Sequence, residues 1–194
     1  MTRPRVVLVD NYDSFTHILA HQLIVSGADI EVLRNDATNY DDATKERFAG
    51  VVISPGPGRP EDSGIASAVV DRWTGRIPIL GVCLGHQLLA RKRGVVVEAK
   101  SPVHGRTSTL VHADVGLFSG LPARFHVARY HSLRVETSDW PASLRITASA
   151  EEDPSLVLAF DDVTSGWHAV QFHPESHLTE YGSDILRRFV SLCR

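Results

Sequence analysis

Residues 77–93 read IPILGVCLGHQLLARKR, and the order of residue types in this stretch indicates how the chain folds. Residues 77–82 form a continuous apolar run, which predicts a buried strand, and residues 84–93 predict a helix. The junction between them, Gly81-Val-Cys-Leu-Gly85, leaves room only for a very tight turn. A buried strand that passes directly into a helix is typical of sheets in which helices connect parallel strands.

The same alternation runs through the first half of the chain. Because the apolar runs are continuous and helix-like stretches separate them, the sequence predicts a parallel sheet covered on both faces. Right-handed crossovers then make it a doubly wound α/β domain. The predicted strands are residues 5–10, 29–34, 51–54 and 77–82, and the predicted helices are residues 15–26, 65–73 and 84–93.

After Gly94 the pattern changes to short alternating runs, which predict an antiparallel extension of the same sheet. Residues 182–192 predict a closing helix. No linker or internal repeat interrupts the chain, so we expect residues 1–194 to form one domain. The alternating runs are residues 95–98, 108–112, 125–129, 145–150, 156–161 and 167–172.

Composition excludes several function classes. The chain has 194 residues and a formal net charge of −3, which does not favour a nucleic-acid or membrane-surface partner. The first residues are unlike a signal peptide, and two cysteines are too few for a disulfide scaffold, so we expect a cytoplasmic protein. Without clustered histidines or a Cys-x-x-Cys pair, we expect no metal site.

Cys83, at the apex of the tight turn, is the candidate nucleophile. A Gly-x-nucleophile-x-Gly elbow holds its central residue in a strained conformation, and small neighbours keep that side chain open to a substrate. At a helix N-terminus, unpaired N–H groups and the helix dipole favour a thiolate, and the N–H of Leu84 would point at a developing oxyanion. The alternative is a buried structural cysteine.

A cysteine nucleophile needs a base, and the base needs an orienting group. His173 and Glu175 follow the predicted strand 167–172. We expect Pro174 to keep this segment extended, so that both side chains share one side and Glu175 accepts a hydrogen bond from His173. Ligands gather at the carboxyl ends of parallel strands, which would bring His173 to Cys83. The alternative is a surface histidine followed by a helix-entry charge.

Two other features are less specific. Ser54-Pro-Gly-Pro-Gly58 follows the third predicted strand and would present backbone N–H groups to an oxyanion or a carboxylate, although it is also compatible with a simple turn. Among the remaining histidines, His104 and His131 lie in glycine- or serine-containing loops and are the hardest to assign to packing or solvent.

Taken together, four motifs resemble those of the class I, triad-type glutamine amidotransferases. The resemblance covers about residues 6–190, and the opening Asp10-Asn-Tyr-Asp-Ser-Phe-Thr16 with His104-Gly-Arg-Thr-Ser108 narrows it to the small subunits of anthranilate synthase and aminodeoxychorismate synthase. The four motifs are Pro55-Gly-Pro-Gly58, Gly81-Val-Cys-Leu-Gly-His-Gln87, Arg129-Tyr-His-Ser-Leu133 and Gln171-Phe-His-Pro-Glu-Ser176.

The resemblance implies a flavodoxin-like sheet and a role for each matching residue. Cys83, His173 and Glu175 match the family's catalytic triad. The matching positions for the oxyanion-hole backbone donors are Gly56 and Leu84, and those for glutamine binding are Gly58, Gln87, Ser132 and Leu133.

The resemblance also implies a partner. The released ammonia would pass to a separate synthase subunit that binds chorismate and Mg²⁺, so the chain itself would need no cofactor. Arg106 in place of the family's lysine, His17-Ile18 after the opening motif and the basic stretch 91–95 depart from the family pattern and leave the partner's identity open. The alternatives are a stand-alone γ-glutamyl hydrolase, a subunit for another chorismate-derived product, and a non-catalytic subunit.

Overall fold

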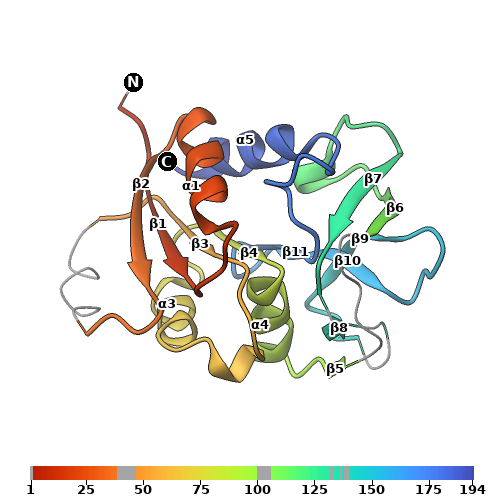
Figure 1. The fold of residues 1–194 in the computed structure, drawn as a ribbon, viewed down its shortest axis with the longest axis horizontal. Helices are drawn as coiled ribbons and strands as arrows, with labels where there is room; N and C mark the ends of the chain where they lie inside the picture. Colours follow the sequence, from red (N-terminus) through yellow and green to blue (C-terminus); the bar gives the residue numbers. More distant parts are fainter. Residues whose placement is uncertain (1, 39–46, 100–105, 132, 136, 138–139) are drawn as a thin grey trace.

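The computed structural model of the chain describes residues 2–38, 47–99, 106–131, 133–135, 137 and 140–194. Its central feature is a nine-stranded mixed sheet in the order β2-β1-β3-β4-β11-β10-β9-β6-β7 (Figure 1). The predicted doubly wound α/β fold is confirmed. The parallel part consists of β1 (Arg5–Asp10), β2 (Asp29–Arg34), β3 (Gly50–Ile53), β4 (Ile79–Val82) and β11 (Trp167–Val170). The antiparallel part consists of β10 (Val157–Asp162), β9 (Arg145–Ala150), β6 (Arg106–His112) and β7 (Arg124–Arg129).

Helices cover both faces of the sheet. One face carries α1 (Thr16–Val25) and α5 (Gly182–Leu192), and the other carries α3 (Ala66–Trp73) and α4 (Leu84–Lys92) (Figure 1). Two short 3-10 helices, η1 (Pro60–Asp62) and η2 (Gly116–Phe118), lie in the connections. This arrangement explains the continuous apolar runs in the sequence, because a strand between two helical layers buries the residues on both of its sides.

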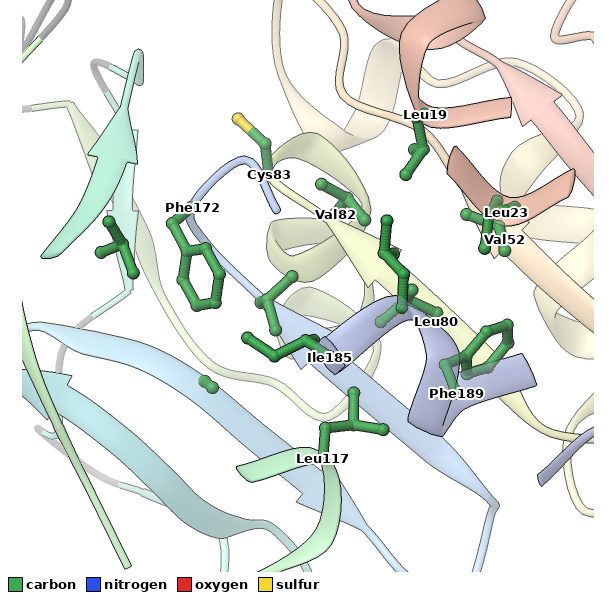
Figure 2. Packing of buried hydrophobic residues seen from close by; sticks show 14 of the residues in the cluster. Leu19, Leu23, Val52, Leu80, Val82, Cys83, Leu117, Phe172, Ile185 and Phe189 are labelled. Atoms are coloured by element: carbon green, nitrogen blue, oxygen red, sulfur yellow. The ribbon is translucent and has the colours of Figure 1, made fainter. Parts of the chain in front are cut away.

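Alternate residues of each parallel strand belong to two hydrophobic clusters. In β1, Val6 and Leu8 pack in the cluster beneath α1 and α5, whereas Val7 and Val9 pack in the cluster beneath α3 and α4. Burying a side chain of this size contributes about 1.5–3 kcal/mol relative to leaving it exposed. Cys83 lies at the margin of the first cluster, and its sulfur points away from the packed side chains (Figure 2).

The parallel register brings the ends of four strands to one edge of the sheet. Val82 pairs with Val170, and Gly81 pairs with Ile53, so the segments that follow β4, β11 and β3 leave the sheet side by side. β1 ends beside β3 at the same edge. The segments that carry the family resemblance at these positions are therefore brought together by the sheet alone.

Two predictions about the second half of the chain are wrong. The run at 95–98 does not extend the main sheet, because β5 (Val97–Ala99) pairs with β8 (Leu133–Val135) in a separate two-stranded sheet. Nor is β11 part of an antiparallel extension: it lies parallel to β4, and the antiparallel part begins at β10. Alternating apolar residues indicate a half-buried strand, but they do not specify its partner.

Candidate active site

Cys83 lies between β4 and α4 with a left-handed backbone, φ 52° and ψ −99°. This conformation is costly for a residue with a side chain. Two neighbouring glycines allow the turn, because a Cβ on Gly81 would lie 2.5 Å from the carbonyl oxygen of Gly85, and a Cβ on Gly85 would lie 2.5 Å from that of Ile53. The strand, turn and helix therefore pack too closely for any other residue type, and the Cys83 side chain stands at the apex.

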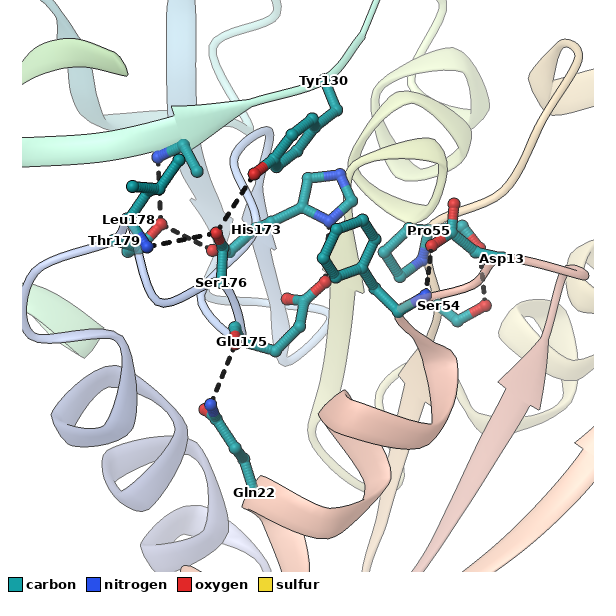
Figure 3. A network of polar contacts seen from close by, with 12 residues as sticks. Asp13, Gln22, Ser54, Pro55, Tyr130, His173, Glu175, Ser176, Leu178 and Thr179 are labelled. Carbon is teal, nitrogen blue, oxygen red and sulfur yellow. Dashed lines mark hydrogen bonds and ion pairs between the residues drawn. The ribbon is translucent and has the colours of Figure 1, made fainter. Parts of the chain in front are cut away.

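His173 and Glu175 form a buried pair in a turn after β11. His173 Nδ1 donates a hydrogen bond to Glu175 Oε1 over 2.7 Å. The expectation that Pro174 keeps the segment extended is wrong, because the N–H of Ser176 donates to the carbonyl of His173 over 3.2 Å and closes a turn. Thr179 Oγ1 donates to the same carbonyl over 2.6 Å. This turn, and not the alternation of an extended strand, folds the carboxylate back onto the imidazole (Figure 3).

The surroundings of His173 act on its pKa in opposite directions. Burial lowers the pKa, but hydrogen bonds with Cys83 and Glu175 and the negative charges of these groups outweigh burial and raise it to about 10. The imidazolium is therefore favoured at neutral pH and pairs with the Cys83 thiolate. The rings of Phe15 and Tyr130 pack edge-on against the imidazole, with centroids 5.3 and 5.0 Å away, and hold it in place.

We expect the pKa of His173 to fall in a Cys83→Ser variant and in a Glu175→Gln variant. Each change removes a negative partner that stabilises the imidazolium, so the pKa should move from about 10 toward or below the ordinary value of 6.5. Heteronuclear NMR of isotope-labelled histidine measures this titration directly. An exposed-site change, His21→Gln, is the control and should leave the His173 titration where it is. An unchanged pKa in both partner variants would contradict the assignment of the pair.

A cavity of about 150 Å³ opens between Cys83 and His173. Leu84, the other predicted oxyanion donor, adjoins it: a Cβ on Gly56 would lie 2.7 Å from Leu84 Cδ2. Ser132 is outside the described residues. Four more residues that the sequence analysis assigned to oxyanion or substrate binding line the cavity, namely Gly56, Gly58, Gln87 and Leu133.

The glycine-containing loop after β3 is fixed by Asn11, the residue that follows β1. The Asn11 N–H donates to Ser54 Oγ over 2.9 Å, and Asn11 Nδ2 donates to the Ser54 carbonyl over 3.0 Å. A Cβ on Gly56 would lie 2.5 Å from Asn11 Cβ, so only glycine lets the loop pack this closely. The opening motif of the chain thus supports the loop that would supply an oxyanion donor.

Sequence reasoning did not assign three cavity-lining residues, Asp13, Phe15 and Tyr130, to the site. All three belong to motifs that had been noted only as part of the resemblance, so their position in those motifs was the available signal. Phe15 and Tyr130 also contact one another, with ring centroids 5.2 Å apart. They form an aromatic wall next to His173, and Asp13 contributes a carboxylate to the cavity.

Two other buried histidines are unsuited to act as the base. Burial first, and then the charge of His131, lowers the pKa of His86 to about 3. Burial first, and then the charge of Arg129, lowers the pKa of His131 to about 3. Both rings are therefore neutral at pH 7, in contrast to His173.

The same two histidines should make the fold sensitive to acid. Below pH 6.5 the unfolded chain protonates them, whereas the folded chain keeps them neutral until about pH 3, so stability is lost as the pH falls through this window. Each contributes a slope of roughly 1.4 kcal/mol per pH unit. Urea unfolding at a series of pH values should show a shallower acid slope for His86→Leu than for the wild type. The exposed-site variant His21→Leu should keep the wild-type slope, and equal slopes for all three proteins would contradict the neutral burial of His86.

The sequence of this chain matches the family model described as Glutamine amidotransferase class-I over residues 7–193. The chain belongs to this family. It is therefore a glutamine amidotransferase, and the presence of Cys83, His173 and the glycine-rich loop around one cavity is consistent with that enzyme class.

Several relatives of this amidotransferase are similar over almost the whole chain. Anthranilate synthase component 2 of Azospirillum brasilense is 40% identical over 97% of this chain and 96% of its own length. Aminodeoxychorismate synthase component 2 of Escherichia coli (strain K12) is 43% identical over 95% of this chain and 98% of its own length. Bifunctional protein TrpGD of Thermotoga maritima is 41% identical over 97% of this chain, but the chain spans only 32% of that protein.

Solved structures agree with the fold. A putative GMP synthase protein from Thermoplasma acidophilum superposes with a TM-score of 0.85 and 28% identity, covering 100% of this chain and 95% of that one. A glutamine amidotransferase from Thermotoga maritima superposes with a TM-score of 0.69 over 90% of this chain and 77% of that one; at 17% identity it supports the fold alone.

Sites of two other kinds are absent from the described residues. None of the helices in this part of the chain is long and apolar enough to cross a membrane. Within the same residues, histidine, cysteine, aspartate and glutamate side chains form no group of three or more that could hold a metal ion.

Proposed function

We propose that this amidotransferase hydrolyses L-glutamine to glutamate and ammonia with Cys83, His173 and Glu175, and that it delivers the ammonia to a separate, chorismate-using synthase subunit. The observation that carries the proposal is the strained Cys83 elbow opposite an imidazole that is itself hydrogen-bonded to Glu175 over 2.7 Å, both at the wall of one cavity.

The chemistry follows from this arrangement. The Cys83 thiolate attacks the side-chain amide carbon of glutamine, and the N–H groups of Gly56 and Leu84 stabilise the resulting oxyanion. His173 gives its proton to the leaving nitrogen, so ammonia departs and a glutamyl thioester remains. His173 then accepts a proton from water as the water attacks the thioester, which releases glutamate and restores the thiolate. Glu175 keeps the imidazole oriented in both steps.

A partner is part of the proposal because ammonia is mostly protonated in neutral water and would be lost as a nucleophile. Relatives named anthranilate synthase component 2 and aminodeoxychorismate synthase component 2 support a chorismate-using synthase as that partner. Their identities to this chain, 40% and 43%, are too similar to separate the two pathways. On this proposal Mg²⁺ belongs to the synthase and not to this chain. The two free thiols, Cys83 and Cys193, fit a reducing cytoplasm.

Co-purification tests the function. The tagged chain is isolated from its native cells, bound proteins are identified by mass spectrometry, and the complex is given glutamine, chorismate and Mg²⁺. Anthranilate as product would assign the protein to tryptophan synthesis, and aminodeoxychorismate to folate synthesis. A chain that binds no synthase and hydrolyses glutamine or γ-glutamyl compounds efficiently by itself would be a stand-alone hydrolase instead.

A further inference from the structure

We propose that His131 is a positioning residue for glutamine binding, which fixes the Leu133 carbonyl at the cavity wall through a hydrogen-bond chain that begins at the buried Arg129. This inference rests on the proposed function in taking the cavity as the glutamine site. It goes beyond that function by giving a role to a residue outside the triad, the oxyanion donors and the glutamine-contacting positions.

The chain of contacts starts on β6 and ends in the cavity. Arg129 NH1 donates to Ser108 Oγ over 2.7 Å, and Arg129 Nε donates to His131 Nε2 over 3.1 Å. His131 Nδ1 lies 2.6 Å from the carbonyl oxygen of Leu133. Both His131 and Leu133 line the cavity, whereas Arg129 and Ser108 are buried behind them.

The order of donors decides the state of the imidazole. The Arg129 guanidinium is a donor only, so His131 Nε2 must be the acceptor and carry no proton. The remaining proton is then on Nδ1 and is donated to the Leu133 carbonyl. Because the cation also disfavours a second proton on the ring, His131 stays neutral and keeps this one tautomer.

The Leu133 carbonyl is held from two sides. Besides His131 Nδ1, it accepts a hydrogen bond from Gln87 Nε2 over 3.3 Å, and Gln87 also donates to Gln171 Oε1 over 3.2 Å. An acceptor with both lone pairs occupied has one orientation, which fixes the peptide plane at the start of β8. A buried hydrogen-bond chain of this kind positions backbone groups for a ligand only while every member is satisfied.

His131 cannot act as the general base itself, because both ring nitrogens are already engaged in hydrogen bonds. Its effect should therefore appear in the affinity for the glutamine-like ligand and not in the reactivity of Cys83. Two alkylating reagents separate these properties. A diazoketone analogue of glutamine must bind the glutamine site before it alkylates Cys83, whereas iodoacetamide needs only an accessible thiolate.

The experiment measures both alkylation rates by mass spectrometry for the wild-type chain, His131→Asn and His131→Leu. Asparagine can place an amide N–H where Nδ1 donates, and leucine cannot. We expect the half-saturating concentration of the diazoketone to rise roughly tenfold to a hundredfold in His131→Leu and only a few-fold in His131→Asn, with iodoacetamide rates unchanged. In an Arg129→Met variant, NMR should show His131 losing its single Nδ1–H tautomer, and the same concentration should rise.

The outcomes are distinct. Equal half-saturation in the wild type and His131→Leu overturns the positioning role, and so does a parallel loss of iodoacetamide reactivity, which would indicate general damage to the site. Should His131→Leu fail to fold, the Arg129→Met measurements decide the question alone: an unchanged tautomer and affinity overturn the proposal. If the diazoketone shows no saturable alkylation of Cys83 in the wild type, it is the proposed function that fails.

Discussion

Replacing Cys83 by serine is expected to lower the rate of glutamine hydrolysis by roughly 10⁴-fold or more. Serine fits the elbow between Gly81 and Gly85, so the fold should survive. A hydroxyl is a far weaker nucleophile than a thiolate, and His173 is protonated in the resting pair and cannot activate it. The measurement is glutamate release from glutamine by the complex of this chain with its synthase.

The matched control uses the other cysteine of the chain. Cys193 is buried near the C-terminus, and burial raises the pKa of its thiol to about 12, so it is not a reactive thiolate. Cys193→Ser should keep glutaminase activity near that of the wild type. If the complex is supplied with ammonia in place of glutamine, Cys83→Ser should also support product formation. Glutamine-dependent turnover at the wild-type rate in Cys83→Ser would refute the assigned nucleophile.

Gly182→Ala is expected to damage both stability and activity, although Gly182 is outside the cavity. A Cβ on Gly182 would lie 1.9 Å from the carbonyl oxygen of Pro174, the residue between His173 and Glu175. The start of α5 or the turn must move, which should cost about 3 kcal/mol of unfolding free energy. Because small displacements of reacting groups are costly, glutamine hydrolysis should fall roughly 10²-fold.

Urea unfolding and glutamate release measure the two effects of Gly182→Ala. Gly75→Ala is the matched control, since a Cβ there would meet nothing within 4 Å. Its φ of 71° is unfavourable for alanine, so Gly75→Ala should lose about 1 kcal/mol of stability and keep its activity. If Gly182→Ala matches the wild type in both measurements, α5 does not hold the turn in the way that the structure indicates.

Gln22 shows how the rest of the fold reaches the same turn. Its Nε2 donates to the Glu175 carbonyl over 3.0 Å, across 153 positions of the sequence (Figure 3). Together, α1, α5 and β7 hold the turn through Gln22, Gly182 and Ala128, whose carbonyl accepts from the His173 N–H over 3.2 Å. No spacing in the sequence indicates these contacts, because each joins segments that meet only after the sheet has formed.

The sequence by itself determined the α/β class, the Cys83 elbow and the segments that form the site. These follow from local physics: continuous apolar runs need burial on both faces, and a turn with glycines at positions 81 and 85 needs its central side chain at the apex. The opening motif was visible as well, but its role was not, because Asn11 acts on a loop that begins 43 residues later.

Only the tertiary structure decided which strands pair and how the site is held. The partner of the run at 95–98 depended on β8, a strand too short to be recognised by pattern, and the approach of Glu175 to His173 depended on a turn stabilised by Ser176 and Thr179. The two kinds of histidine were also indistinguishable in sequence. Burial beside Arg129 keeps His131 neutral, whereas burial beside Cys83 and Glu175 favours the charged form of His173, so the neighbours that folding supplies determine the chemistry of each ring.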